Sequence, residues 1–515
     1  MGYSQRSIYD NLAVPLAMAK RAAAFDLTLP LRDATMPSYR QLYEALRSEI
    51  LDGRLGPGSR LPATRDLARQ YQLSRGTIVN AFELLKSEGY LEGNVGSGTY
   101  VSKVLPDELW QVKIDGQRRG DRGTQLERRT PRRRVSGYAQ RVHLFPPFGA
   151  GPARAFRANI PALDLFPANL WAQIVARRWR RVSTNLLLGC DPMGYRPLRD
   201  AVADYLATSR GVRCAPEQVA IVSGVQEALD LVARLFLNPG DRVGIENPGY
   251  VGAAMVFEAV GAKISVLSLD SEGIELRAPS LRGTRLVYVT PGHQFPLGIN
   301  MSLTRRLQLI EWARKAGALI FEDDYDSEYR YSGRPVPALQ GLDRSGSVLF
   351  AGSFSKVLFP SLRLGYLVIP PDLVDYFSAT KSITSRHAQL LDQAVLSDFI
   401  TEGHFGRHLR RMRGVYAERL SVLLQSAREN LAGLLDISGV EAGLQTVGWL
   451  HGGISGEPAA RAAAARNVEV VPLGRYTRGR VAQDGLQLGF AAVDAREIQR
   501  GVKELAVALQ NSRRA

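Results

Sequence analysis

The sequence contains only two cysteines in 515 residues, Cys190 and Cys214. So few thiols exclude a disulfide framework and favour a reducing compartment. Long hydrophobic runs are absent too, since no stretch of about 18 apolar residues is available to cross a membrane. The opening residues, MGYSQRSIYDNLAVPLAMAK, lack the basic start and continuous apolar run of a signal peptide. We therefore expect a cytoplasmic protein without a membrane partner.

Histidine is scarce as well, with six in the whole chain. His404 and His408 stand four apart on a predicted helix, but the pattern around them does not complete a metal site. We therefore expect no bound metal. The composition, 45% hydrophobic and 23% charged, is that of a folded protein. A chain of this length exceeds what one core usually organises, so two or more domains are expected.

The net charge of +16 suggests an acidic partner such as nucleic acid. The excess is unevenly placed. Residues 36–102 carry 8 basic and 7 acidic side chains, whereas residues 103–141 carry 11 basic and 5 acidic ones. The second segment is charged, without periodicity, and includes RRTPRRR. It is either a solvated linker or a basic strap that adds non-specific attraction to phosphates.

Residues 1–35 show no clear pattern and are interpreted as an extension. From residue 37, apolar residues at helical spacing predict a helix that ends before Gly53. A short helix is predicted over residues 64–71. Ser74 is suited to cap a further helix over residues 75–87, which ends before Gly89. The segment YLEGNVGSGTYV predicts two strands around a glycine-rich tip, so residues 36–102 predict an α+β winged helix-turn-helix.

These residues resemble the GntR family of bacterial regulators. The resemblance extends over the segment ILDGRLGPGSRLPATRDLARQYQLSRGTIVNAFELLKSEGYLEGNVGSGTYV. The resemblance implies binding to double-stranded operator DNA. In the helix over residues 75–87, one apolar face is predicted to be buried, formed by Ile78, Ala81, Phe82 and Leu85. The polar face would enter the major groove, where Arg reads guanine and Asn reads adenine. The residues predicted to contact DNA are Arg65, Ser74, Arg75, Thr77 and Asn80, with Gly96, Ser97 and Gly98 at the wing tip.

Residues 142–515 alternate strand-like apolar runs with helical patterns. The runs include QVAIV, RVGIE, RLVYVT, ALIFED, SVLFAGS and LGYLVI. Strands that alternate with helices predict an α/β domain with a mainly parallel sheet covered on both faces.

The segment VLFAGSFSKVLFPSLRLGYLVIP resembles the lysine segment of fold-type I, aminotransferase-like pyridoxal phosphate enzymes. The resemblance implies that Lys356 forms a Schiff base with the cofactor aldehyde. Ser353 and Ser355 would donate hydrogen bonds to the cofactor phosphate, and Arg363 would add a charge-assisted bond. A catalytic role beyond the Schiff-base lysine is not assigned to any residue.

Three other segments fit the same cofactor. In ALIFEDDYDSEYRY, Asp323 is predicted to face the pyridine nitrogen, with Asp324 as the alternative, and Tyr325 to bond the ring 3′-oxygen. In VAIVSGVQEALDLVARLF, a strand, turn and helix offer the backbone amides of Gly224, Val225 and Gln226 to the phosphate. In IENPGY, Tyr250 is either a plate stacked on the ring or a core aromatic.

A GntR-like DNA-binding domain followed by an aminotransferase-like domain is similar to the domain order of the MocR (GabR-like) regulators. That resemblance implies a head-to-tail homodimer and a regulator that senses a small amine, an amino acid or pyridoxal phosphate itself. Two positions depart from active aminotransferases. Phe295 stands where they have asparagine, and Gln487 stands where they have an arginine for the substrate carboxylate. These departures favour a sensor. The alternatives are an active aminotransferase with an attached DNA-binding domain and a regulator without cofactor.

Overall fold

The computed structural model describes residues 36–94, 98–105, 134–145, 151–332, 337–437, 439–479 and 483–514. The chain divides into two compact units, Met1–Thr130 and Pro131–Ala515. None of the helices in the described ranges has the length and apolar character that a membrane span requires.

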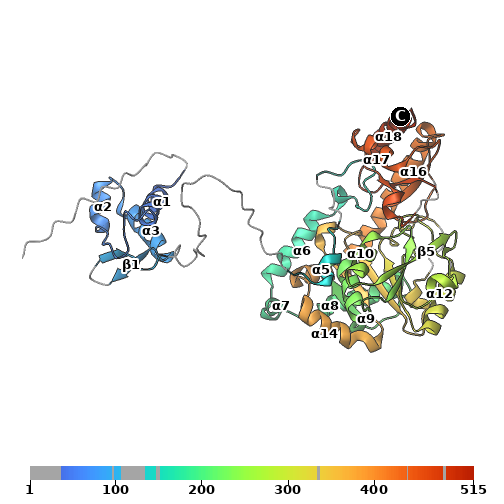
Figure 1. Ribbon diagram of the computed structural model, residues 1–515, viewed down its shortest axis with the longest axis horizontal. Coiled ribbons are helices and arrows are strands. Elements are labelled where there is room, and N and C mark those ends of the chain that lie inside the picture. Colours follow the sequence, from blue (N-terminus) through green and yellow to red (C-terminus); the bar gives the residue numbers. More distant parts are fainter. Residues whose placement is uncertain are drawn as a thin grey trace, which may run out of the picture. The chain divides into compact units, whose positions relative to one another are not determined.

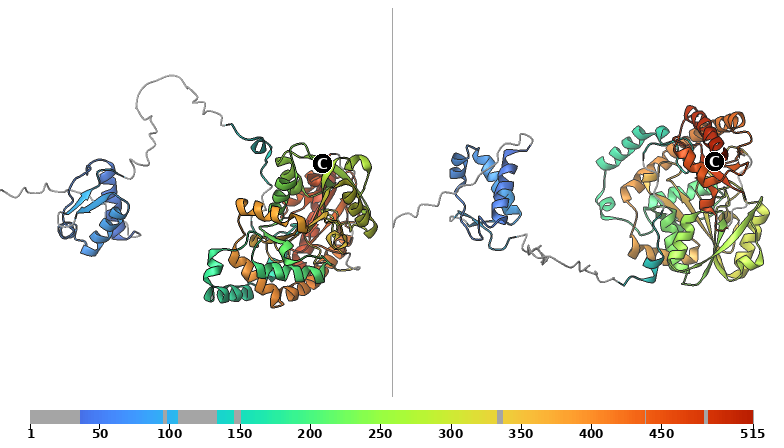
Figure 2. Two further views of the ribbon diagram at one scale, coloured as in Figure 1. Left: turned by 90° about the horizontal axis from the view of Figure 1, so that it is seen from below. Right: turned by 45° about the horizontal axis from the view of Figure 1, so that its top comes forward.

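The described residues of the first unit form three helices and a two-stranded antiparallel sheet (Figure 2). The elements are α1 (Ser38–Leu51), α2 (Thr64–Gln70), α3 (Arg75–Ser87), β1 (Leu91–Asn94) and β2 (Gly98–Val101). Leu46, Ile78 and Phe82 form part of its core, with 1%, 0% and 2% of their surface exposed. The winged helix-turn-helix prediction is confirmed.

Helix α3 begins and ends where the sequence predicted. Ser74 Oγ accepts a 3.1 Å hydrogen bond from the backbone N–H of Thr77, which satisfies one of the free donors at the helix start. Gly89, after the end of the helix, has a φ of +84°, a conformation that glycine adopts without strain. The buried face is the predicted one, formed by Ile78, Ala81, Phe82 and Leu85.

The second unit is built on an eight-stranded sheet with the order β3-β10-β9-β8-β7-β4-β5-β6. The strands β9, β8, β7, β4 and β5 pair in parallel, while β10 is antiparallel to both β9 and β3. The bounds are β3 (Val219–Val222), β4 (Arg242–Asn247), β5 (Lys263–Asp270), β6 (Gly273–Ile274), β7 (Thr284–Val289), β8 (Leu319–Asp324), β9 (Val348–Ser353) and β10 (Gly365–Val368). The predicted, mainly parallel α/β sheet is confirmed.

Helices cover both faces of this sheet (Figure 1). Along β7, Leu286 and Tyr288 pack into the apolar cluster that contains α9 and α10, whereas Val287 and Val289 pack into the cluster that contains α12. Alternate side chains of a strand point to opposite faces, so both faces are buried. The helices that follow β3, β4 and β7 are α9 (Val225–Phe236), α10 (Val251–Ala259) and α12 (Leu303–Ala316).

A separate four-stranded antiparallel sheet lies in the carboxyl-terminal part of this unit. Its strands are β11 (Leu435–Ile437), β12 (Gln445–Leu450), β13 (Val471–Pro472) and β14 (Gly485–Gly489), and its helices are α16 (His404–Asn430), α17 (Gly456–Ala464) and α18 (Ala495–Arg514). Figure 1 shows these three helices together at one end of the unit. The sequence analysis did not predict this sheet.

The remaining helices belong to the large unit, and two of them pack into its core. Helices α6 and α7 extend along one edge in both views of Figure 2. The bounds are α5 (Gly137–Arg141), α6 (Ala168–Arg180), α7 (Thr184–Leu188), α8 (Arg196–Ser209), α11 (Ala278–Leu281), α13 (Leu339–Leu342), α14 (Val374–Thr384) and α15 (Leu390–Thr401). Arg141 donates a 3.1 Å hydrogen bond to the carbonyl of Ala259. Residues 137–141, predicted as the end of the linker, thus pack on the large unit.

Candidate functional site

The predicted cofactor residues follow the carboxyl ends of neighbouring strands. Asp323 and Asp324 end β8, and Ser353 ends β9. Gly224 follows β3, and Tyr250 follows β4. The carboxyl ends of parallel strands meet at one edge of a sheet, which is where α/β domains bind ligands. Residues spread over the sequence are therefore gathered at one edge.

Asp323 is buried and has one oxygen in use. Tyr288 Oη donates a 2.6 Å hydrogen bond to Asp323 Oδ2. Oδ1 is buried and has no hydrogen-bond partner among the described residues. Burial raises the pKa of Asp323 to about 7. Because a buried carboxylate oxygen without a donor is unfavourable, this atom suits a ligand that brings an N–H group.

Asp324 points to the other face of the strand. Its Oδ2 accepts a 2.6 Å ion-paired hydrogen bond from Arg210 Nε, and the two side chains are 4% and 9% exposed. Neighbouring residues in a strand face opposite sides, so the two aspartates cannot serve the same ligand. Asp324 Oδ1 is also buried without a partner among the described residues, but the ion pair holds this side chain on the opposite face and leaves Asp323 as the better candidate for the pyridine nitrogen.

Lys356 lies in the loop between β9 and β10. Its Nζ donates a 3.0 Å hydrogen bond to the carbonyl of Asn159. Burial lowers the pKa of Lys356 to about 8, although the negative charges of Asp326 and Asp323 act in the opposite direction. A lowered pKa increases the neutral fraction of the amine, which is the form that condenses with an aldehyde.

An anion cradle lies beside this lysine. Gly224 has a φ of +130°, and a Cβ built on it would stand 3.5 Å from Arg363 Nη2. The guanidinium of Arg363 thus lies against the amino-terminal end of α9, where the first N–H groups have no partner within the helix. Ser353 Oγ accepts from the backbone N–H of Ser355 at 3.2 Å, and Ser355 Oγ is buried without a partner in the described ranges.

Aromatic side chains line the other side of the site. Gln226 Nε2 donates a 2.7 Å hydrogen bond to Tyr250 Oη, which fixes the phenol ring. Phe295 lies edge-on to Tyr250 and Tyr325, with ring centroids 5.9 Å apart in both pairs. Phe295 therefore places an apolar ring at the position where the sequence comparison assigns an asparagine to active aminotransferases.

Together these residues fit pyridoxal phosphate. The site has a buried lysine for the aldehyde, a carboxylate with a free oxygen for the ring nitrogen, and a positive cradle for the phosphate. The roles of Lys356, Asp323, Tyr325, Ser353, Ser355, Arg363, Gly224, Val225, Gln226 and Tyr250 stay predictions.

The position expected to bind a substrate carboxylate differs from that of an enzyme. Gln487 is fully buried on β14, and its Oε1 accepts a 2.8 Å hydrogen bond from Tyr476 Oη. Gln487 Nε2 has no partner among the residues that the structure describes. Tyr476 packs against Phe295 with ring centroids 5.0 Å apart, which links this neutral amide to the cofactor site.

Several residues at the site were missed by the sequence analysis. Tyr288 bonds to Asp323 and His293 to Tyr325. Asp326 bonds in turn to His293, and Arg210 pairs with Asp324. No motif marked Tyr288 or Arg210. Alternation along RLVYVT places Tyr288 on the same face of the sheet as the helices α9 and α10, which is the only signal that the sequence offered for it.

The outward face of α3 carries the predicted DNA contacts. Arg75 and Asn80 are exposed, as is Arg65 on α2. Thr77 is half-buried, and its hydroxyl lies 2.8 Å from that of Ser74. At the wing, Gly98 has a φ of +112° and begins β2. Gly96 and Ser97 lie outside the described residues.

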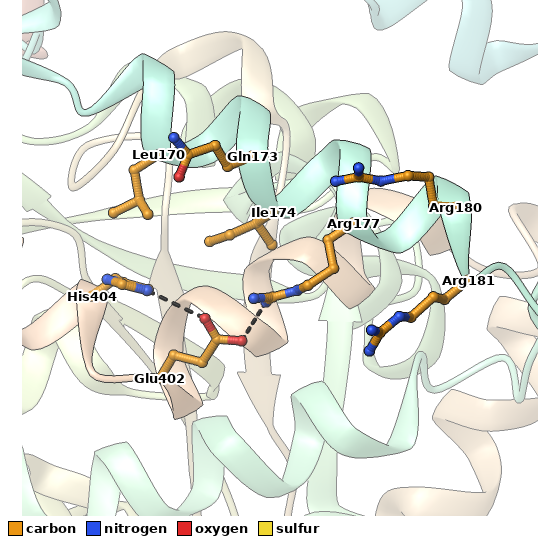
Figure 3. Close-up of a pocket in the computed structure, with 8 residues that line it drawn as sticks. All are labelled: Leu170, Gln173, Ile174, Arg177, Arg180, Arg181, Glu402 and His404. Carbon is orange, nitrogen blue, oxygen red and sulfur yellow. Dashed lines mark hydrogen bonds and ion pairs between the residues drawn. The ribbon is translucent and has the colours of Figure 1, made fainter.

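A cavity with a volume of about 640 Å³ lies elsewhere, beside α6 (Figure 3). Glu402 forms ion pairs there with Arg177 and His404. None of the predicted cofactor residues lines it. The two histidines have different partners: His408 Nε2 lies 3.2 Å from the carbonyl of Val357, whereas His404 contacts Glu402. Within the described ranges, no three His, Cys, Asp or Glu residues gather as a metal site.

Two family models match the chain. Residues 38–101 match the bacterial regulatory proteins of the gntR family, and residues 166–502 match the aminotransferases of class I and II. The second family is dependent on pyridoxal phosphate. The two matches coincide with the two units of the structure.

The relatives share both parts. The chain is 41% identical over 475 residues to the probable rhizopine catabolism regulatory protein MocR of Rhizobium meliloti, covering 92% of this chain and 94% of that protein. It is 29% identical to the pyridoxine biosynthesis transcriptional regulator PdxR of Corynebacterium glutamicum, covering 88% of this chain and 92% of that protein.

The large unit alone is similar to solved aminotransferases. The α-aminoadipate aminotransferase LysN of Thermus thermophilus superposes with a TM-score of 0.64 at 31% identity, covering 69% of this chain and 92% of that one. The family follows from this structural similarity together with the gntR family match and the full-length regulatory relatives. The chain belongs to the MocR-type transcriptional regulators, which join a GntR-family DNA-binding domain to an aminotransferase-like domain.

Proposed function

We propose that this regulator binds pyridoxal 5′-phosphate in its large unit and that a small-molecule effector at this site changes its binding to operator DNA. The observation that carries the proposal is the set of unsatisfied polar groups at one sheet edge. Asp323 Oδ1 and Ser355 Oγ are both buried without a partner among the described residues. Unpaired buried polar atoms of this kind are expected where a ligand completes the hydrogen bonds.

Each residue has a distinct task in this proposal. Lys356 would hold the cofactor covalently, and Asp323 would keep its ring nitrogen protonated. Arg363 and the first amides of α9 would neutralise the phosphate. Tyr250 would cover the ring. When bound, the cofactor supplies an aldehyde that reacts with primary amines, so an amine, an amino acid or the cofactor itself could be the signal.

We propose that the exposed side of the DNA-binding domain contacts DNA. Arg75 and Asn80 project from the first two turns of α3, the part of a recognition helix that reaches base edges. Arg65 and Ser74 are suited to phosphate, and Gly96, Ser97 and Gly98 are proposed to enter the minor groove.

A homodimer is proposed because large apolar side chains stay exposed on the large unit. Leu187 and Leu188 of α7 are 61% and 80% exposed, and Tyr376 and Ile383 of α14 are 62% and 85% exposed. Exposed apolar side chains of this size favour association with another surface. Sedimentation of the full-length chain should give twice the mass of 56.6 kDa; a monomer at working concentration would contradict this part.

The deciding experiment titrates operator DNA with the full-length protein, with and without pyridoxal phosphate and with a panel of primary amines. A ligand can act only by binding two states unequally, so at least one condition should shift the dissociation constant or the DNA bend. If the cofactor binds and no condition changes either quantity, the sensor function is wrong.

A second candidate is transamination. The chain is 31% identical over 363 residues to the 2-aminoadipate transaminase of Thermus thermophilus, covering 90% of that protein. Phe295 and Gln487 argue against it, because Phe295 has no polar atom and Gln487 has no positive charge for a substrate carboxylate. Sustained turnover of about one per second with an amino donor and an oxo acid would favour the enzyme.

A further inference from the structure

Three side chains, two of them buried and one half-buried, form a hydrogen-bonded chain next to Lys356. Tyr325 Oη lies 3.0 Å from His293 Nδ1. The same nitrogen lies 3.0 Å from Asp326 Oδ1 and 3.2 Å from Oδ2. His293 and Asp326 are 3% and 1% exposed, so water does not compete for these contacts.

The partners determine which atom donates. A carboxylate can only accept, and Asp326 Oδ2 also accepts from the backbone N–H of Leu444 at 3.3 Å. His293 Nδ1 must therefore carry the hydrogen that both neighbours share. Tyr325 Oη then accepts from His293, and its own hydrogen is free to point to another acceptor.

The imidazole is held in place by the backbone on two sides. A Cβ built on Gly443, whose φ is +93°, would lie 2.2 Å from His293 Cε1 and 2.7 Å from Asp326 Oδ2. A Cβ on Gly298, whose φ is +77°, would lie 3.1 Å from His293 Nε2. Both positions require glycine for conformation and for space. The backbone lies close to the ring on both sides, which restricts its rotation and favours Nδ1 directed at Tyr325.

Several charged groups act on these hydrogen-bonded side chains and on Lys356. Asp326, Asp323 and Glu246 are the anionic groups that act on Tyr325, and Asp326 also acts on Lys356. Phe295 lies edge-on to Tyr325, 5.9 Å between ring centroids, and has no polar atom. Of these two side chains, only Tyr325 can donate a hydrogen bond to a ligand oxygen.

We propose that His293 is a positioning residue which, with Asp326, holds Tyr325 as a hydrogen-bond donor toward the ring 3′-oxygen of the cofactor. The inference rests on the proposed binding of pyridoxal phosphate and adds the means by which one tyrosine serves without an asparagine at position 295. A donor to this oxygen stabilises its negative charge. It thereby lowers the pH at which the lysine-bound cofactor gives up its proton.

The test measures the absorbance of the bound cofactor against pH in full-length variants. His293→Asn keeps an N–H near the position of Nδ1, whereas His293→Gln places its amide near Nε2, and His293→Leu removes the donor. We expect the midpoint of the absorbance change to rise by about one pH unit in His293→Gln and His293→Leu, which corresponds to about 1.4 kcal/mol. It should stay near the wild-type value in His293→Asn.

A double-mutant cycle with Tyr325→Phe separates this role from a general structural one. Without the phenol, replacing His293 should no longer move the midpoint. Equal midpoints for the asparagine and glutamine variants, or an unchanged His293 effect in the Tyr325→Phe background, would overturn the inference. The Asn and Gln pair decides the question even if His293→Leu does not fold. Wild-type protein that shows no cofactor absorbance would instead defeat the proposed function.

Discussion

Tyr288 holds one oxygen of Asp323 at 2.6 Å and leaves the other oxygen buried without a partner in the described part of the chain. The phenol thus fixes the direction of the carboxylate before any ligand arrives. A preset acceptor avoids the entropic cost of ordering the side chain on binding.

Asp323→Asn should weaken the binding of pyridoxal phosphate by at least about tenfold, or about 1.4 kcal/mol, because the amide removes the charge that favours a protonated ring nitrogen. Asp324→Asn serves as the matched control. It breaks the ion pair with Arg210 and should lower the melting temperature with a smaller effect on the cofactor. Spectroscopic titration measures the affinity; a larger loss in Asp324→Asn would reverse the assignment.

Lys356→Ala should abolish the long-wavelength absorbance of the bound cofactor, because no other amine replaces the covalent link. Among the described residues, the side chain makes a hydrogen bond to the carbonyl of Asn159 alone, so the apo protein should keep its fold. Circular dichroism checks the fold, and Lys381→Ala gives a comparison in which a buried lysine is lost from its ion pair with Glu227. Survival of the band in Lys356→Ala would refute the choice of lysine.

Glu246 should make the stability of the large unit dependent on pH. Burial raises the pKa of this carboxyl from 4.5 to about 7, while hydrogen bonds from Thr290 and Gln294 act in the opposite direction. The folded state then holds a proton that the unfolded state loses, so stability is greatest below the unfolded pKa and falls as the pH rises toward 7.

Urea unfolding followed by tryptophan fluorescence measures this loss, which is at most about 3 kcal/mol. Glu246→Gln has no proton to lose and should flatten the decline between pH 5 and 7, to the extent that Glu246 contributes. Parallel pH profiles for the variant and the wild type would show that Glu246 is not responsible.

Arg75→Ala and Asn80→Ala should each cost about 1–3 kcal/mol of operator affinity and relax the sequence preference, because we propose that both side chains read base edges. Lys86→Ala is the control on the same helix, since Lys86 lies at the far end and pairs with Glu83 at 3.0 Å. Fluorescence anisotropy with operator and scrambled DNA checks both effects. Equal losses on the two DNAs would assign these residues to phosphate contacts.

Local signals predicted the fold well. Ser74 caps α3, glycines follow the helices, and the apolar runs became β3, β4, β7, β8, β9 and β10. Caps and periodicity act within a few residues, so one sequence suffices to detect them. The lysine and aspartate segments could be singled out for the same reason: each is a continuous sequence motif at the end of a strand.

Contacts across the fold could not be predicted in this way. Tyr288, Arg210 and Asn159 reach the site from segments that carry no motif, and each is defined only by the partner that folding places opposite it. The choice between Asp323 and Asp324 required the same information. The small sheet of β11 to β14 was missed in part because β11 and β13, with three and two residues, are too short to show a periodic pattern.

The antiparallel pairing of β9 with β10 limits how the lysine loop can change in length. Ser353 pairs with Gly365, so the loop over residues 354–364 is tied at both ends by the same ladder. The ladder fixes the two ends of this loop and not its interior, so a residue inserted or deleted between Ser353 and Lys356 would keep the pair but displace Lys356 from the carbonyl of Asn159. Natural variation between Ser353 and Lys356 should therefore occur by substitution rather than by insertion.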